Sequence, residues 1–363
     1  MPISGRCCTA LLPVSIGPER VITPGPARLS GAPAEVTTVE RALRLLETMA
    51  VIRAFEERAG EEAARGRVPG VVHQSVGQEA VATGVAANLR REDYLFSNHR
   101  GHGHAIAKGA DPAAMMLELF GREGGTCGGK GGSMHIADFS VGMLGANGIL
   151  ADGATMAVGA AQAIRLLGED RISCVFIGDG TVNRGPFLES LNWAAVFELP
   201  VLYVIEDNIY ASSTLTASVL AGPGIAARAA AFGIPATVVD GNDAIGVDRV
   251  ARELIDEVRN GRNGTGPRLL HATTYRVTGH ISRDALHYRP AGELERFLPL
   301  DPIARLCAWL RDRGVDAEQC EDVLARARAS IARAAEEASA APYPAAERAY
   351  EDVQDIGGPR PCA

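Results

Sequence analysis

The 363-residue sequence has no apolar run long enough to cross a lipid bilayer, which needs about 20 consecutive residues. Its first 36 residues also lack the apolar core of a signal peptide, because the Ala10–Pro13 run is too short. They are rich in proline, glycine and small residues, so we expect residues 1–36 to form a flexible or partner-covered arm. No membrane partner is expected.

Cysteines are few and follow no pattern. There are seven, an odd number at scattered spacings, which favours a reducing cytoplasm over a disulfide framework. An excess of basic charge is also absent, since the net charge of −8 argues against a nucleic acid as the main partner. We therefore expect a cytoplasmic globular protein, with either one large α/β domain or two small ones.

Two short apolar runs flank a helix-length segment in the middle of the chain. Residues 172–177 and 201–205 are rich in β-branched residues and do not alternate with polar ones, as in strands buried on both faces. Residues 187–198 between them have helical periodicity. A strand–helix–strand crossover makes the two strands parallel. The sequence thus predicts an α/β fold with a doubly wound, mostly parallel sheet.

Both ends of this domain have helical patterns. Thr37, followed by Glu40, reads as a capping box that opens a helix reaching about Gly66. Another strand is expected at residues 269–275. From Asp301 onward the chain is rich in alanine, arginine and glutamate, which predicts a pair of helices. We therefore expect an α/β domain over 37–300 and a helical C-terminal extension of it over 301–363.

Oxygen-bearing side chains follow both central strands. Asp179 stands after the first strand and Asn208 after the second, so both should lie at the carboxyl edge of the sheet, where open α/β folds bind ligands. Gly178 and Gly180 allow close approach of the backbone, and amides from Thr181 onward suit a phosphate. Carboxylate and amide oxygens suit Mg²⁺. The alternative is a helix-capping Asp and a turn Asn.

The Gly-Asp-Gly motif with Asn208 behind it is similar to the thiamine diphosphate signature. Together with further motifs in the same order over residues 37–350, the chain resembles the alpha subunit of the decarboxylating component of 2-oxo acid dehydrogenase complexes. The likeness is greatest to acetoin dehydrogenase, then to pyruvate dehydrogenase. The motifs that carry it are residues 52–57, 73–80, 99–104, 128–135, 147–149, 178–183, 199–200, 208–210, 274–280 and 284–289.

This resemblance implies thiamine diphosphate and Mg²⁺ as cofactors. It implies metal binding by Asp179, Asn208 and the Tyr210 carbonyl, and catalytic roles for His73 and His280. The remaining cofactor contacts that it implies are His99, Arg100, Gly148, Leu150, Gly178, Gly180 and Thr181.

Two local patterns leave alternatives open. His99, His102 and His104 could form a zinc site, although no cysteine or carboxylate is near in sequence. His102 and His104 otherwise support the fold. The glycine-rich stretch 124–135 is either a flexible active-site loop or a direct ligand contact, and His135 could approach the substrate.

The resemblance also implies that another chain supplies one residue of the active site. In this family the glutamate that activates the cofactor belongs to a beta subunit, and no second cofactor-type half follows residue 300. An α2β2 heterotetramer with a lipoyl acyltransferase partner is therefore implied. Four residues depart from the family pattern, namely Asp152, Arg184, Asp207 and Ile281. Because of them, the substrate is left open between acetoin, pyruvate and a branched 2-oxo acid. A carboligase without a lipoyl partner, or a non-catalytic scaffold subunit, remain the alternatives.

Overall fold

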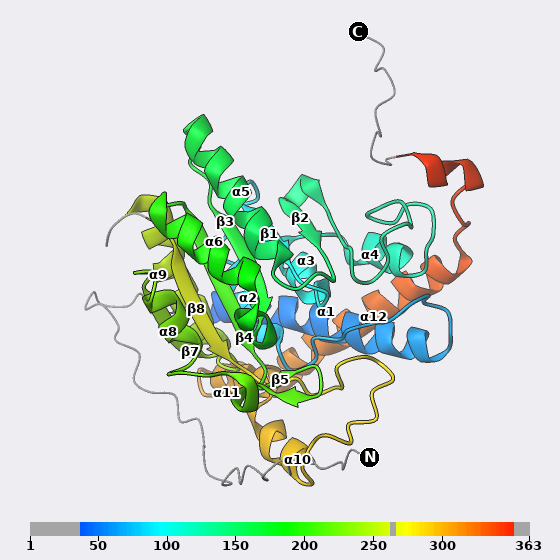
Figure 1. The fold of residues 1–363 in the computed structure, drawn as a ribbon. Coiled ribbons are helices and arrows are strands. Elements are labelled where there is room, and N and C mark those ends of the chain that lie inside the picture. The colour runs from blue at the N-terminus through cyan, green and yellow to red at the C-terminus, as the bar shows by residue number, and fades with distance from the viewer. Residues whose placement is uncertain (1–36, 262–265, 352–363) are drawn as a thin grey trace, which may run out of the picture.

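The computed structural model describes residues 37–261 and 266–351, so the expected arm 1–36 and residues 352–363 lie outside the described part (Figure 1). Six parallel strands form one sheet in the order β2-β1-β3-β4-β8-β7, which confirms the predicted mostly parallel α/β fold. The six strands are β1 (Tyr94–Ser97), β2 (Met143–Ala146), β3 (Ser173–Gly178), β4 (Val201–Asp207), β7 (Ala236–Asp240) and β8 (Arg268–Thr273).

Helices cover both faces of this sheet, and a short antiparallel hairpin lies beside it (Figure 1). The longer helices are α1 (Val39–Ala64), α2 (Glu79–Ala86), α3 (His102–Lys108), α4 (Pro112–Leu119), α5 (Asp152–Leu167), α6 (Gly185–Val196), α9 (Ala244–Asn260), α11 (Pro302–Arg311) and α12 (Ala317–Ala340). The short elements are β5 (Tyr210–Ala211), β6 (Thr214–Leu215), α7 (Thr216–Val219), α8 (Ile225–Ala230), α10 (Glu293–Phe297) and the 3-10 turns η1 (Phe139–Val141), η2 (Asp179–Asn183), η3 (Leu298–Leu300) and η4 (Ala346–Tyr350).

Each central strand supplies two hydrophobic cores because successive side chains point to opposite faces of a sheet. On β3, Cys174 and Phe176 pack in the core that also holds α1, α2, α9 and α12. Val175 and Ile177 pack on the other face, in the core formed with α5, α6 and α8. This explains why the strand sequence is continuously apolar instead of alternating.

The winding of the chain reverses between β1 and β3. From β1 the chain passes through α3 and α4, which pack in the first core, and reaches β2 on one side. It returns through α5, which packs in the second core, to β3 on the other side of β1. The carboxyl ends of β1 and β3 therefore lie at the switch point, where open α/β sheets leave a ligand-binding crevice.

Some predicted boundaries are corrected. The capping box is wrong: Thr38, and not Thr37, caps α1 by accepting from the Arg41 amide at 3.2 Å. Glu40 instead pairs with Arg44 one turn along the helix at 2.6 Å. The middle helix α6 begins two residues earlier than predicted, because the proline near its first residue suits a helix start.

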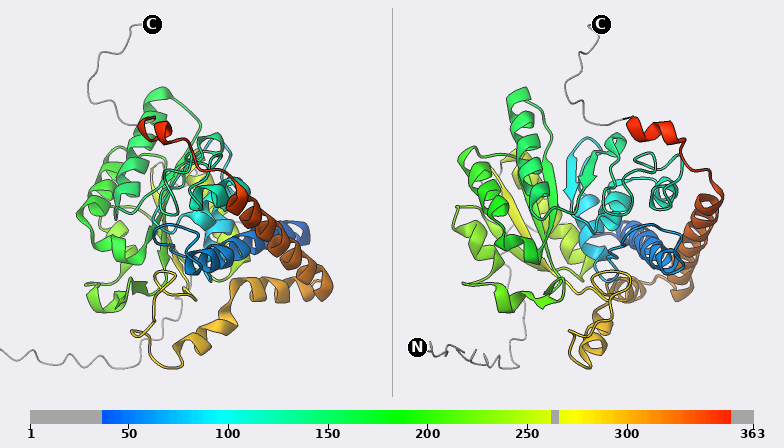
Figure 2. Two further views of the ribbon diagram at one scale, coloured as in Figure 1. Left: turned by 90° about the vertical axis from the view of Figure 1, so that its right-hand side faces the viewer. Right: turned by 45° about the vertical axis from the view of Figure 1, so that its right-hand side comes forward.

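The C-terminal pair of helices is confirmed as α11 and α12. Figure 2 shows α12 lying across α1, and the apolar faces of these two helices share one core. None of the helices in residues 37–261 and 266–351 has both the length and the hydropathy that a membrane span requires.

Candidate active site

One cavity of about 390 Å³ opens at the carboxyl ends of the central strands. All twelve residues predicted for the site line it: His73, His99, Arg100, Gly148, Leu150, Gly178, Asp179, Gly180, Thr181, Asn208, Tyr210 and His280. Seven further residues complete the lining, namely Gln78, Asn98, Met134, Glu206, Ala211, Ser212 and Arg276. The fold thus gathers the predicted residues, which come from six separate stretches of sequence, at the switch point of the sheet.

The ends of β3 and β4 bring Asp179 and Asn208 to the same wall of the cavity. Gly178 on β3 is level with Glu206 on β4, so the residues that follow these two strands leave the sheet together. Asp179 is buried and accepts hydrogen bonds from the Thr216 hydroxyl and the Gly180 amide. Burial and the neighbouring Asp207 carboxylate raise its pKa well above the usual range. A cation bound here would stabilise the ionised carboxylate.

The residues predicted to bind the metal offer hard oxygen donors. Asn208 is buried beside Asp179 and lies next to a turn in which Ile209 adopts φ +67, a rare value for a β-branched residue. This turn leads the chain back along the cavity wall to Tyr210. A carboxylate, an amide oxygen and a main-chain carbonyl are the ligand types that Mg²⁺ prefers. The donor chemistry therefore fits the magnesium ion that was predicted.

The glycines around Asp179 differ in what they do. Gly178 has an ordinary extended backbone, φ −77, so this position does not require glycine for its conformation. At Gly180 a Cβ atom would lie 2.6 Å from the Cβ of Ala211, so this position requires glycine for close approach. The 3-10 turn η2 begins at the preceding residue, Asp179, and the Gly180 amide donates to the Asp179 carboxylate at 2.9 Å.

Two buried arginines line the cavity without an ion pair to any described residue. Arg100 donates to the main-chain carbonyls of Gln74 and His280, and Arg276 donates to the Ser212 carbonyl and the Tyr288 hydroxyl. Burial and the charge of Arg276 lower the pKa of Arg100 to about 9. Two buried cations without carboxylate partners are costly, and a diphosphate would compensate both. Arg276 was not predicted as a site residue, although it lies four residues before His280 within the 274–280 motif.

Three histidines close the cavity on another side. The ring centroids of His73 and His99 are 4.6 Å apart, and those of His73 and His280 are 5.0 Å apart. Burial and the nearby Arg100 charge lower the pKa of His73 to about 3, of His99 to about 2 and of His280 to about 4. All three imidazoles are therefore neutral at physiological pH.

This trio has ring nitrogens within 4.8 Å of one another, a spacing that could hold a metal ion. The Arg100 and Arg276 charges that depress the histidine pKa values would also repel a cation at this point. The trio is therefore poorly suited to binding a metal ion.

The zinc alternative for the other histidines is not supported. His102 bonds to Glu56 at 2.9 Å and to Ser133, whereas His104 pairs with Glu206 at 3.2 Å, and neither lines the cavity with His99. Both histidines support the fold, as expected.

The glycine-rich stretch is a braced loop. The buried Glu118 carboxylate accepts from the amides of Cys127, Gly129, Gly131 and Gly132 at 2.7–3.0 Å. These amides are therefore occupied and do not bind the cavity ligand. Met134 is the residue of this loop that lines the cavity.

The proposed approach of His135 to the substrate is corrected, because its ring is exposed and faces the Gly131 carbonyl. The departures Asp152 and Arg184 do not line the cavity either. Asp207 pairs with His271 on the neighbouring strand at 2.9 Å.

Proteins of similar sequence identify the family of this chain. The family described as "Dehydrogenase E1 component" matches residues 47–347. The alpha subunit of acetoin:2,6-dichlorophenolindophenol oxidoreductase from Cupriavidus necator is 46% identical over 86% of this chain and 94% of its own length. The protein of the same description from Bacillus subtilis is 43% identical over 87% and 94%. The pyruvate dehydrogenase E1 component alpha subunit of Rhizobium meliloti is 36% identical over 86% and 89%. The chain therefore belongs to the dehydrogenase E1 component family of thiamine diphosphate-dependent enzymes.

Proposed function

We propose that this chain is the alpha subunit of a dehydrogenase component that cleaves acetoin and passes the acyl unit to a lipoyl acyltransferase. The observation that carries the proposal is a single cavity combining oxygen donors, two buried arginines without ion pairs and three neutral histidines. The related acetoin oxidoreductase alpha subunits, at 46% and 43% identity, support acetoin over pyruvate as the substrate.

The cofactor end of the cavity would hold magnesium and diphosphate. Asp179, Asn208 and the Tyr210 carbonyl would bind Mg²⁺, whose remaining positions suit phosphate oxygens and water. Arg100 and the Thr181 amide would bind the diphosphate, Gly180 would allow its close approach to the backbone, and Gly148 and Leu150 would contact the ring. Arg276 would add a second cationic contact. When bound, thiamine diphosphate supplies the nucleophilic carbon that attacks a carbonyl.

The histidine trio would act on the substrate. His73 and His280 would hold and move protons at the substrate oxygens, and His99 would complete the wall between them. An acetoin molecule is uncharged and offers a carbonyl and a hydroxyl, which neutral imidazoles can bind as donors and acceptors. This favours a hydroxyketone.

A beta subunit would complete the site. Glu206 and Asp179 are the two carboxylates of the described lining, and Glu206 is already bound to His104, so neither is available to activate the cofactor ring. Ile149, between the lining residues Gly148 and Leu150, is 66% exposed, and Trp193 and Val196 on α6 are also exposed apolar side chains. We propose that the beta subunit covers this surface in an α2β2 assembly.

We propose that the protein acts in the cytoplasm. The four cysteines in the described part of the chain, Cys127, Cys174, Cys307 and Cys320, are all free thiols, which supports a reducing environment.

Calorimetric titration of thiamine diphosphate with MgCl₂, with and without the beta subunit, tests the proposal. We expect magnesium-dependent binding that strengthens when the beta subunit is added and is lost in Asp179→Ala. Tight binding to the chain alone that Asp179→Ala leaves unchanged would overturn the shared-site proposal.

Turnover across acetoin, pyruvate and branched 2-oxo acids tests the substrate. Acetoin should give the highest kcat/KM, with a lipoyl domain as acceptor. Ligation of an aldehyde acceptor without consumption of any of these substrates would indicate a carboligase. A complex that binds the cofactor but performs neither reaction would indicate a scaffold subunit.

A further inference from the structure

Gln78 lines the cavity beside Asn208, although no motif pointed to a role for its side chain. The Asn208 Nδ2 amide donates to Gln78 Oε1 at 3.1 Å, across 130 positions of sequence, and both side chains are buried. A carboxamide carries its oxygen and its NH₂ group on opposite sides of the terminal carbon. Because Gln78 holds the NH₂ group of Asn208, the Asn208 oxygen is turned the other way.

The Asn208 oxygen retains capacity for another partner. It accepts from the Tyr210 amide at 3.3 Å, a long contact, and a carboxamide oxygen has two lone pairs. A metal ion can therefore bind to it without displacing the contact that fixes the NH₂ group.

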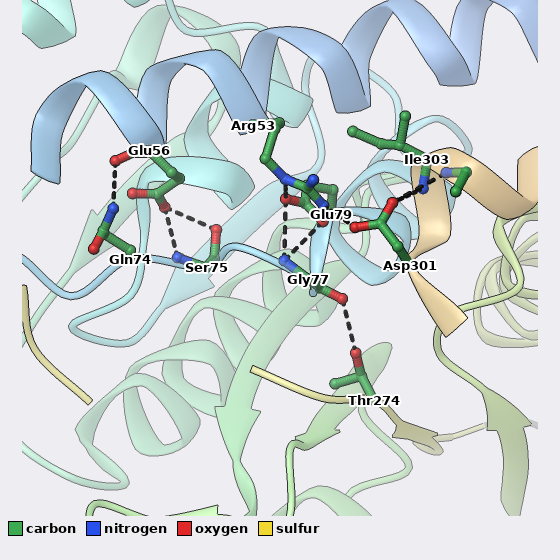
Figure 3. Close-up of polar contacts among 10 residues, drawn as sticks. Arg53, Glu56, Gln74, Ser75, Gly77, Glu79, Thr274, Asp301 and Ile303 are labelled. Carbon is green, nitrogen blue, oxygen red and sulfur yellow. Dashed lines mark hydrogen bonds and ion pairs between the residues drawn. The ribbon is translucent and has the colours of Figure 1, made fainter. Parts of the chain in front are cut away.

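The backbone that carries Gln78 is fixed on both sides (Figure 3). The Gly77 amide donates to the Glu79 carboxylate, which pairs with Arg53, and the Thr274 hydroxyl donates to the Gly77 carbonyl at 3.3 Å. Gly77 adopts φ +95, and a Cβ atom there would lie 2.4 Å from the Tyr275 carbonyl oxygen. The Gln78 oxygen is thus presented from a rigid turn.

The two ends of the Gln78 amide differ. Its oxygen accepts from Asn208, whereas its Nε2 atom is buried without a hydrogen-bond partner among the described residues. Buried donors without a partner are uncommon. The hydrogen bond between Gln78 and Asn208 is made by the Gln78 oxygen alone. A carboxylate at this position would offer the same acceptor.

We propose that Gln78 is a positioning residue, which turns the Asn208 amide oxygen toward the magnesium ion. This inference rests on the proposed function, because it requires that Asn208 binds the metal.

The test is calorimetric titration of the complex with its beta subunit, using thiamine diphosphate at a series of MgCl₂ concentrations. Gln78→Leu removes the acceptor and leaves the Asn208 amide free to turn, so the magnesium concentration for half-maximal binding should rise about tenfold. Gln78→Glu keeps an acceptor oxygen and should restore magnesium dependence to within about threefold of the original chain. Thr83→Val, a buried polar-to-apolar change on α2 outside the cavity lining, should leave magnesium dependence unchanged.

Two outcomes would overturn the inference while leaving the proposed function intact. One is that Gln78→Leu changes the magnesium dependence by less than twofold, and the other is that Gln78→Glu is impaired as much as Gln78→Leu. Thermal unfolding without ligand separates a misfolded variant from a metal-specific defect. If binding to the original chain does not depend on magnesium or on Asp179, the proposed function fails and this inference fails with it.

Discussion

The Arg53 guanidinium binds the Glu79 carboxylate through two hydrogen bonds, Nε to Oε1 at 2.5 Å and Nη2 to Oε2 at 3.0 Å. The same guanidinium reaches Asp301 at the start of α11 at 2.7 Å. One side chain of α1 therefore joins the first residue of α2 to the C-terminal helices (Figure 3). Because the Glu79 carboxylate also holds the Gly77 amide, this ion pair connects the fold to the cavity wall.

Replacing Arg53 should destabilise the protein strongly. Arg53→Ala would leave the fully buried Glu79 carboxylate without its cation, and breaking a buried pair in this way costs about 3–5 kcal/mol. Urea unfolding should show this loss. Arg44→Ala removes an exposed pair on the same helix and should cost no more than about 0.5 kcal/mol. Equal effects of the two substitutions would contradict this account.

The histidine trio should titrate at unusually low pH. NMR titration of the ligand-free chain should give pKa values near 3 for His73 and near 4 for His280, with His73→Asn used for assignment. Adding inorganic diphosphate should raise both values, because it neutralises Arg100 and Arg276. Values that do not respond to diphosphate would argue against an anion at these arginines.

The same pKa shifts have a consequence for stability. Since these histidines have lower pKa values in the folded chain than the usual 6.5, protonation favours the unfolded chain. Above about pH 6.5 the histidines are neutral in both states and do not change the free energy of unfolding. As the pH falls toward 4 they gain protons in the unfolded chain first, so the free energy of unfolding decreases. Urea unfolding of the original chain should show a steeper loss over this range than His73→Asn does. If the free energy of unfolding changes with pH in the same way for both chains, His73 has the same pKa in the folded and unfolded states.

Gly180→Ala should disturb the metal site through steric overlap. The new Cβ atom would lie 2.6 Å from the Cβ of Ala211, and overpacking of this kind costs about 1–3 kcal/mol. We expect weaker diphosphate binding and a lower free energy of unfolding. Gly159→Ala in α5 meets no atom within 4 Å and should stabilise the helix by about 0.5–1 kcal/mol. A Gly180→Ala chain with unchanged stability and diphosphate binding would show that the β5–β6 hairpin can shift to accommodate the added methyl group.

Glu118 should control the order of the glycine-rich loop. Glu118→Ala leaves four main-chain amides without their acceptor, so trypsin should cleave after Arg122 and Lys130 at least about tenfold faster. Glu336→Ala, an exposed change on α12, should not alter the cleavage rate. Equal rates in both variants would mean that the loop is held by other contacts.

Local sequence determined the elements around the proposed metal site. The strands near residues 172–177 and 201–205, the helix between them and the positions of Asp179 and Asn208 were all predicted, because a parallel strand–helix–strand unit restricts where its loops fall. The capping box failed because Thr37 and Thr38 are adjacent and equally suitable as caps. Thr38 is the one with an extended backbone and a bond to the Arg41 amide.

The tertiary structure alone decided which residues from distant segments share the cavity. Gln78 and Asn208 are 130 positions apart, and Arg100 meets the loop of His280 across 180 positions. No periodicity or spacing encodes such contacts, because they depend on how α1, α2 and the loop after β8 pack together. The sequence by itself therefore determined the fold class and the oxygen donors. Packing determined the two buried arginines, the neutral histidine trio and the hydrogen bond between Gln78 and Asn208.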